Sequence, residues 1–378
     1  DKGAVWVARR VPDGFISGHA NQARIRQFPL NDPANCLYAP DVIRFAREKG
    51  WFDGKDEDFS FADTYCPPTA GKLRSCESRV WSMFRRAAPS AGLTSDMVDG
   101  STLKKPVPLW VKPDRKLAVQ DAMALMRDHF EGTPFDMNLD VGGGPFASPY
   151  RWRPMSFVVD SVTYVHERAI STQQTGFSFV TQSRASLPDP IGGVLWYGVD
   201  DSYLTCYVPM YCGITRAPKG WGTGVADFGA FSWESAFWVF NFVSNWVYSR
   251  YSDMVVDLQT VQQELEGGFL AQQPGVEAAA LKLHEQSPRL AVDYLTDYST
   301  RQGEMVIERW RRLGEFLLWK YVDGNVRDTQ GHVQHPKYRE DWYRAIVRDA
   351  GPRVRLPKPD AEPPRAAAPP ATPVGVPT

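Results

Sequence analysis

The sequence lacks the short motifs that mark the most common enzyme sites. Its 378 residues contain no HExxH zinc motif, no CxxC pair, no GxGxxG or GxxxxGKS/T phosphate-binding loop and no GxSxG nucleophile turn. The five cysteines and six histidines are scattered, without the spacing of a zinc finger. We therefore predict no metal site and no nucleotide or other organic cofactor.

An excess of charge of either sign is also missing. Lysine and arginine total 43 against 44 aspartates and glutamates, a formal net charge of −1. Such a chain has no broad electrostatic attraction to nucleic acid or to an anionic membrane, so neither is expected as a partner. The most apolar run, 231–251, contains Glu234 and Arg250, which predicts a core helix rather than a membrane span. The compartment stays open, because a signal peptide would lie before Asp1.

Strand-like and helix-like patterns occur in separate blocks. Short β-branched and aromatic runs favour strands over 1–30 and 156–215, the second block as an antiparallel meander. Apolar residues at helical spacing favour helices over 40–130 and 231–323. Segregated blocks predict the α+β class rather than a doubly wound parallel sheet. Within the last block we predict separate helices at 231–251, 253–266, 276–286, 289–298 and 301–321.

The domain is expected to end near residue 325. Residues 326–351 are polar and are predicted to form a connecting segment. Of the 27 residues in 352–378, nine are proline, and we predict a disordered tail rich in proline and alanine.

Two polar clusters are candidates for a site. The first, 17–24, follows a predicted strand and contains His19, Asn21, Gln22 and Arg24. An Asn amide at such a strand end can stabilise an oxyanion, although a loop that satisfies its own backbone gives the same pattern.

The second cluster, 167–176, precedes a predicted strand and includes Thr172, Gln173 and Gln174. It can line a cleft in which Arg168 or Arg184 holds a carboxylate, or it can be a polar hairpin loop.

Two further charged patterns lie near the second cluster. Arg151 and Arg153 flank a tryptophan and can cradle an acidic group or simply cover a surface aromatic residue. Asp200 and Asp201 are predicted to form a turn, with carboxylates on opposite sides of an extended chain and therefore poorly placed for shared acid–base work.

Longer runs carry more information than these clusters. They are 5–14 (VWVARRVPDG), 16–25 (ISGHANQARI), 127–136 (RDHFEGTPFD), 170–177 (ISTQQTGF), 187–193 (LPDPIGG) and 231–238 (FSWESAFW). Together, in this order and over about 1–323, they resemble the bacterial C69-type dipeptidases.

That family is similar to the N-terminal-nucleophile hydrolases, which share an αββα sandwich. The resemblance implies cleavage of dipeptides by an N-terminal Cys, whose thiol attacks the amide while its own α-amine acts as the base, without metal or cofactor. Here the first residue is Asp1, and the opening strand resembles the middle of the family's catalytic domain. We therefore expect an incomplete sandwich that lacks its nucleophile and is inactive alone, with the missing N-terminal segment of the same protein as a partner.

The resemblance also implies roles for the two clusters. Asn21 matches the place of an oxyanion-stabilising Asn in related cysteine amidases. The cleft wall is then expected to include His19, Gln22, Arg24, Thr172, Gln173 and Gln174.

Two other functions stay open: an acylase of the same fold that cuts a non-peptide amide, and a non-catalytic binding or assembly subunit. A homo-oligomer is possible. Loss of sandwich strands predicts an exposed edge at 5–8 or a concave apolar face.

Overall fold

The computed structural model describes residues 3–103 and 105–356. They divide after Pro336 into two compact units, which are treated separately below. The strands are β1 (Val7–Arg9), β2 (Ile16–Ser17), β3 (Cys36–Tyr38), β4 (Trp110–Val111), β5 (Ser156–Val159), β6 (Val162–Val165), β7 (Phe177–Ser183), β8 (Gly193–Val199), β9 (Val208–Tyr211), β10 (Val326–Arg327) and β11 (Val333–Gln334). The helices are α1 (Val42–Glu48), α2 (Phe61–Tyr65), α3 (Ala70–Lys72), α4 (Ser78–Ala87), α5 (Val119–Met126), α6 (Asp189–Gly192), α7 (Ala236–Ser249), α8 (Tyr251–Gln286), α9 (Pro288–Tyr321) and α10 (Glu340–Ala350).

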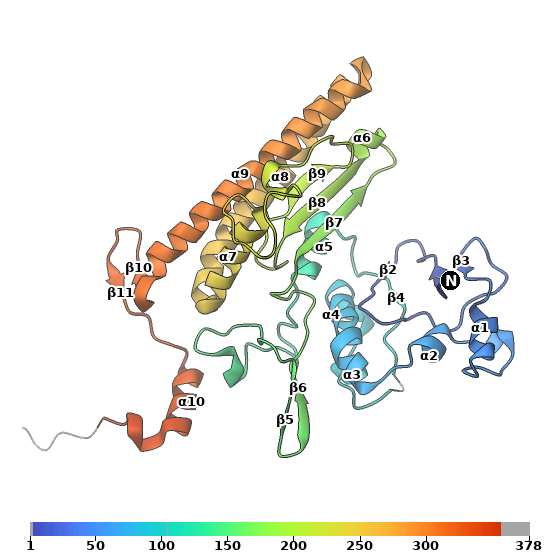
Figure 1. Ribbon diagram of the computed structural model, residues 1–378, viewed down its shortest axis with the longest axis horizontal. Coiled ribbons are helices and arrows are strands. Elements are labelled where there is room, and N and C mark those ends of the chain that lie inside the picture. Colours follow the sequence, from blue (N-terminus) through green and yellow to red (C-terminus); the bar gives the residue numbers. More distant parts are fainter. Residues whose placement is uncertain (1–2, 104, 357–378) are drawn as a thin grey trace, which may run out of the picture. The chain divides into compact units, whose positions relative to one another are not determined.

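The predicted α+β class is confirmed, because helices and antiparallel strands share the first unit (Figure 1). The described residues contain one three-stranded sheet, β7-β8-β9, and four two-stranded ones. In the larger sheet Trp196 of β8 lies opposite Val180 of β7 and Pro209 of β9. The expected antiparallel meander is therefore present, while β5 and β6 pair only with each other.

The largest core lies between this sheet and the long helices α7, α8 and α9. Trp196 is fully buried, and Phe240 of α7 stacks on Trp310 of α9 with ring centroids 4.8 Å apart. Large aromatic residues contribute much of the apolar area that a core removes from water. On the other face of the sheet, Phe177 and Phe179 are about half exposed.

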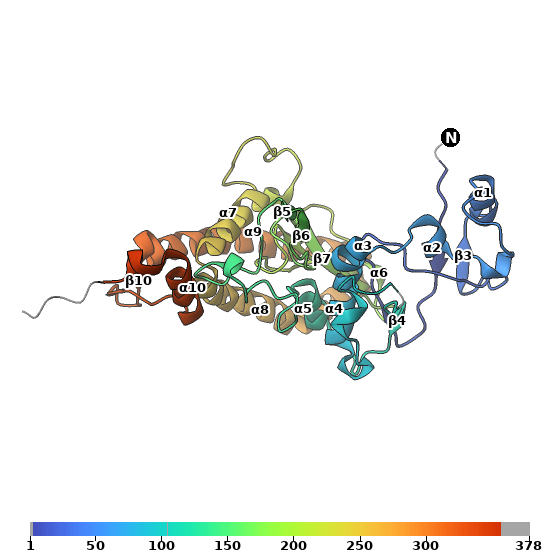
Figure 2. The same cartoon turned by 90° about the horizontal axis from the view of Figure 1, so that it is seen from below.

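Two of the predicted breaks inside the helical block, near 252 and 287, are confirmed within two residues, whereas those at 267–275 and 299–300 were wrong. Figures 1 and 2 show α8 and α9 as two long helices side by side, and α8 continues through Gly267, Gly268 and Pro274. Two glycines and a proline cost a helix interior several kcal/mol, ~1 for each glycine and ~3 for the proline. Packing against α9 offsets this cost, because α8 buries residues such as Leu265 and Phe269 along its length.

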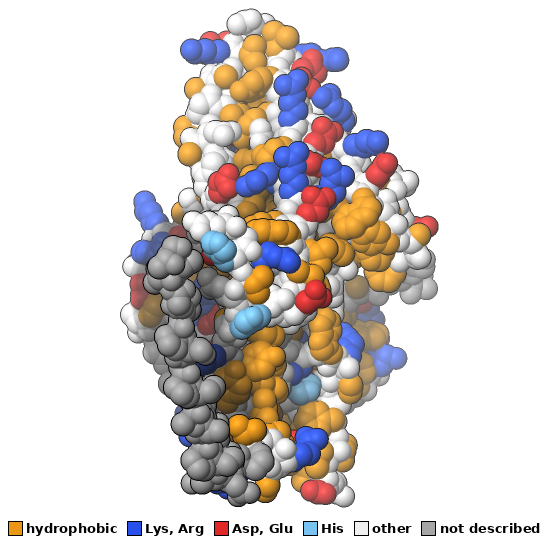
Figure 3. Space-filling model, turned by 90° about the vertical axis from the view of Figure 1, so that its left-hand side faces the viewer, with side chains coloured by type: hydrophobic (Ala, Val, Ile, Leu, Met, Phe, Trp, Pro, Cys, Tyr) orange, Lys and Arg blue, Asp and Glu red, His pale blue; other side chains and the backbone are white. Residues whose placement is uncertain are grey.

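Charged side chains cover the outer surface of the helix pair. Arg309 pairs with Glu264 at 3.0 Å, and Lys320 pairs with Asp257 at 2.8 Å. Figure 3 shows the same mixture on one face of the molecule, where red and blue side chains are interspersed with exposed hydrophobic ones. No described helix is both long enough and apolar enough to span a bilayer.

The N-terminal part has two smaller cores of its own. One contains Phe84, Val98 and Phe130, and the other surrounds α1. Strand β1 pairs with β3 along one edge and with no other described strand along the second edge, and Trp6 beside it is 45% exposed. The edge expected near residues 5–8 is therefore present.

The second unit contains α10, where the Tyr338 and Tyr343 rings pack 5.7 Å apart at its start. The segment predicted as a polar connection thus includes an ordered helix. The predicted tail, 352–378, lies outside the described residues except for 352–356.

Candidate active site

A cavity of about 520 Å³ opens in the first unit next to the second polar cluster. We call it the arginine pocket. Its wall comes from the turn after α3, from the loops before β5 and after β6, and from the loop before β7. The polar residues that line it include Arg74, Ser75, Asp99, Arg151, Arg153, His166, Glu167, Arg168, Thr172, Gln173 and Gln174. Its volume lies within the range of small-molecule sites, about 300–1,000 Å³.

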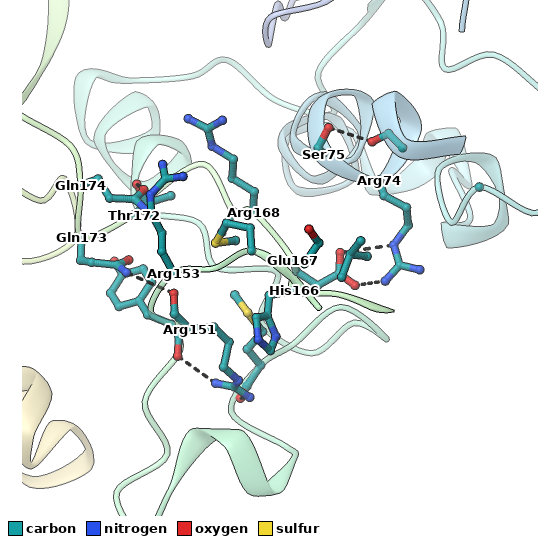
Figure 4. A pocket seen from close by; sticks show the side chains of 18 of the residues that line it. Arg74, Ser75, Arg151, Arg153, His166, Glu167, Arg168, Thr172, Gln173 and Gln174 are labelled. Carbon is teal, nitrogen blue, oxygen red and sulfur yellow. Dashed lines mark hydrogen bonds and ion pairs between the residues drawn. The ribbon is translucent and has the colours of Figure 1, made fainter. Parts of the chain in front are cut away.

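Two arginines of the arginine pocket have no carboxylate partner among the described residues. Arg74 forms an ion pair with Glu167, and Arg151 binds Asp140. Arg153 and Arg168 form no ion pair, and Figure 4 shows their guanidinium groups without a bonded neighbour. An exposed arginine in a cavity can hold a carboxylate through two parallel hydrogen bonds.

The loop before β7 presents polar groups to the same cavity. Thr172 donates to the Gln174 side chain at 3.1 Å, and the Gln173 amide donates to the Arg151 carbonyl at 3.3 Å. Thr175 closes the turn through a 2.7 Å bond to the Thr172 carbonyl. These bonds hold the loop in place. The two glutamines line the cavity, and each keeps further side-chain donors or acceptors that a ligand can use.

A buried polar network lies beneath this loop and was not found from the sequence. The Tyr150 hydroxyl lies 2.7 Å from His129 Nε2 and donates to Asp201 at 3.0 Å, and Asp201 also accepts from Ser171 at 3.0 Å. Since Tyr150 donates to the carboxylate, the His129 Nε2–H donates to Tyr150. Burial and the Asp201 charge raise the pKa of Tyr150, so its proton stays on the hydroxyl. The network fixes Ser171, the residue before Thr172.

The neighbouring carboxylate belongs to a different set of bonds. Asp200 has φ +64° and accepts from Asn241 at 2.8 Å and from Ser244 at 2.5 Å. The two carboxylates therefore bind different partners, and the turn predicted at Asp200 and Asp201 is a bend at Asp200 followed by a turn at 202–204. Both aspartates are at least 98% buried, which a surface turn would not be. Burial raises the pKa of Asp200 to about 7.

Asn21 lies at the edge of the arginine pocket rather than inside it. Its φ is +58°, a conformation that Asn tolerates better than most residues. Its side-chain oxygen accepts from Arg79 at 3.0 Å, and Arg79 also donates to the carbonyl of Ser75, which lines the pocket. The amide nitrogen is thus the atom of Asn21 left to donate. The Cys76 thiol lies 3.9 Å from the backbone oxygen of Asn21, not from this amide.

The other residues of the first cluster lie elsewhere. His19 and Arg24 line a separate hollow of about 290 Å³ with Trp6 and Trp110. Gln22 is buried. The Arg24 guanidinium binds Glu77 at 2.9 Å and the carbonyls of residues 18 and 107–109, so all its donors already have acceptors. The structure therefore brings Thr172, Gln173 and Gln174 together in the arginine pocket. It places Asn21 next to Arg79, close to Ser75 on the wall of that pocket, and leaves His19, Gln22 and Arg24 outside it.

The sequence was compared with models of known protein families to identify the family to which it belongs. The model of peptidase family C69 matches residues 2–264, more than half of the chain. The chain belongs to peptidase family C69.

Individual C69 relatives are similar at low identity. A protein named probable dipeptidase from Salmonella dublin is 28% identical over 58% of this chain and 44% of its own length. Probable dipeptidase B from Streptococcus pyogenes serotype M1 is 22% identical over 84% of this chain and 59% of its own length. Dipeptidase A from Lactobacillus helveticus is 21% identical over 58% of this chain and 41% of its own length. The C69 chain spans about half the length of these curated relatives.

The sequence of this C69 chain predicted only some of the arginines that line the arginine pocket. Arg168 and Arg153 were among the arginines considered as carboxylate ligands, and both line the arginine pocket. Arg184, the alternative, instead pairs with Glu277 at 2.7 Å. The contact between Tyr150 and His129 could not be predicted, because His129 belongs to the run 127–136 and Tyr150 lies 21 positions further on, outside any motif.

Proposed function

We propose that this chain is the C-terminal portion of a dipeptidase of the N-terminal-nucleophile type, whose attacking Cys lies outside the 378 residues. Membership of family C69 and the names of the relatives support hydrolysis of dipeptides. The chain spans only part of those relatives, which supports a nucleophile contributed by further polypeptide.

The arginine pocket is the observation that carries the substrate assignment. A dipeptide has a free carboxylate close to its scissile bond, and Arg153 and Arg168 offer unpaired cations for it. Thr172, Gln173 and Gln174 line the same cavity and provide hydrogen bonds for the peptide group. A longer peptide would lack this terminal carboxylate at the required distance.

Asn21 has a role in this proposal. Attack by the thiolate on the carbonyl carbon moves the electron pair to the carbonyl oxygen, and a donor aimed at that oxygen stabilises the tetrahedral intermediate. Arg79 binds the Asn21 oxygen, which leaves the amide nitrogen as the donor of that side chain. The α-amine of the Cys takes the thiol proton and later gives a proton to the leaving amine.

Reconstitution tests this proposal. Joined to the upstream segment of a C69 relative that starts with its mature Cys, the chain should hydrolyse dipeptides, and replacing that Cys by Ser should abolish turnover. Cys76→Ser should leave activity in place, because the Cys76 thiol faces a backbone oxygen. Thiol-dependent hydrolysis by the 378-residue chain alone, lost in Cys76→Ser, would overturn the proposal.

Removal of one pocket cation should change substrate affinity rather than chemistry. In the joined enzyme Arg168→Gln should raise KM for a dipeptide about tenfold with kcat nearly unchanged, since a charged hydrogen bond contributes ~1.5–3 kcal/mol. The corresponding dipeptide amide, which has no carboxylate, should show the same KM with both enzymes. Arg301→Gln, an exposed arginine of α9, is the matched control. An equal effect on the dipeptide and its amide would show that Arg168 does not bind the carboxylate.

A further inference from the structure

A second cavity adjoins the arginine pocket and has a different chemistry. It measures about 580 Å³, and we call it the aromatic pocket. Gln173 and Gln174 line both cavities. The remaining lining residues are Thr175, Gly176, Asp200, Ala226, Asp227, Phe228, Ser235, Phe237, Trp238 and Asn241.

Three rings form one side of the aromatic pocket. The ring centroid of Phe228 lies 6.0 Å from that of Trp238 and 6.4 Å from that of Phe237. The Trp238 indole is fixed by a 3.1 Å bond from its Nε1 to the Asp227 carbonyl. The Phe228 side chain is 85% exposed, which is rare for phenylalanine and leaves a ring face free for a ligand.

The charges of the two cavities are opposite. The aromatic pocket is lined by the carboxylates of Asp200 and Asp227 and by no Lys, Arg or His. Asp227 binds only the backbone N–H of Gly229, at 2.7 Å, and forms no ion pair with a described residue. Aromatic faces together with the uncompensated carboxylate of Asp227 favour a cation that carries an apolar stem.

We propose that the aromatic pocket binds the side chain of a basic N-terminal residue of the substrate, so that the enzyme prefers dipeptides beginning with Lys or Arg. This inference rests on the proposed function. With the substrate carboxylate at Arg153 and Arg168, the scissile peptide group lies at Gln173 and Gln174, which border both cavities. The N-terminal residue then extends into the aromatic pocket, where the rings cover its methylene stem and the Asp227 carboxylate faces its charge.

Direct binding separates this inference from the proposed function. Tryptophan fluorescence or calorimetry on the 378-residue chain should show that lysyl-alanine binds about tenfold more tightly than norleucyl-alanine, which has a similar shape but no side-chain charge. 6-Aminohexanoyl-alanine, which keeps the terminal ammonium and lacks the α-ammonium, should also bind more tightly than norleucyl-alanine. If 6-aminohexanoyl-alanine binds no better than norleucyl-alanine, or if neither lysyl nor norleucyl dipeptide binds, the inference is overturned.

Charge-removing variants locate the preference. Asp227→Asn and Phe228→Leu should each reduce the lysyl-over-norleucyl ratio at least threefold, while Asp53→Asn, an exposed carboxylate that lines neither cavity, should leave it unchanged. A preference retained in both pocket variants would overturn the assignment. Preferential binding of lysyl-alanine without hydrolysis in the joined enzyme would remove the proposed function and keep the site. Hydrolysis with equal kcat/KM for lysyl-alanine and norleucyl-alanine would support the proposed function and overturn the assignment of the aromatic pocket.

Discussion

Glu266→Gln should lower the free energy of unfolding by about 3–5 kcal/mol, because it leaves a buried arginine without its counter-charge. Arg127, which follows α5, binds both carboxylate oxygens of Glu266 on α8, at 2.5 and 3.0 Å. Glu266 Oε1 also accepts the Tyr207 backbone N–H at 2.8 Å, and Arg127 donates to the carbonyl of Ser202. The pair therefore ties the segment 200–207, which carries both buried aspartates, to two helices.

The same helix supplies a matched control. Glu264 forms an exposed ion pair with Arg309, so Glu264→Gln should change stability by less than about 1 kcal/mol. Urea unfolding followed by far-UV circular dichroism measures both variants. Similar shifts of the two urea midpoints would contradict a special role for the buried pair.

Local patterns predicted the fold where one element is stabilised by its own residues. The runs around Phe177–Ser183 and Gly193–Val199 alternate and are bounded by turn residues, and both are strands with the expected antiparallel pairing. The predicted break between 266 and 276 contains Gly267 and Pro274, which disfavour helix locally, yet α8 is continuous there. The neighbouring helix α9 overrides that preference, and a pattern read within one segment does not include a neighbour.

The candidate site, like the fold, could be predicted only where its residues are adjacent in the sequence. The loop Thr172–Gln174 could be predicted, because its polar residues are consecutive and precede a strand. Its support could not, because Tyr150 and Asp201 come from segments 51 positions apart and meet only after folding. The polar run around Asn21 predicted a single cleft, whereas Arg24 binds Glu77 and backbone carbonyls instead.

Asp200→Asn should abolish the pH dependence that this carboxylate gives to stability. Burial raises the pKa of Asp200 from 3.8 to about 7, so the folded protein keeps a proton there that the unfolded chain releases above about pH 4. Stability from this group is complete below pH 4 and is lost as the pH rises through 7. A difference of about three pKa units corresponds to ~4 kcal/mol, and we expect about 3 kcal/mol between pH 4 and 8.

The variant isolates this contribution, because Asn has no charge to bury and tolerates the φ of +64° at this position. Between pH 4 and 8 the free energy of unfolding of Asp200→Asn, relative to the unsubstituted chain, should rise by about 3 kcal/mol in urea titrations. Asp227→Asn, an exposed carboxylate of the same cavity, should show no such rise, and an equal rise would contradict the assignment to Asp200. A cation in the aromatic pocket, which Asp200 lines, is attracted to this carboxylate only when it is ionised, above about pH 7. Lysyl-alanine should therefore raise the urea midpoint of the unsubstituted chain more at pH 8 than at pH 5, and this difference should be smaller in Asp200→Asn.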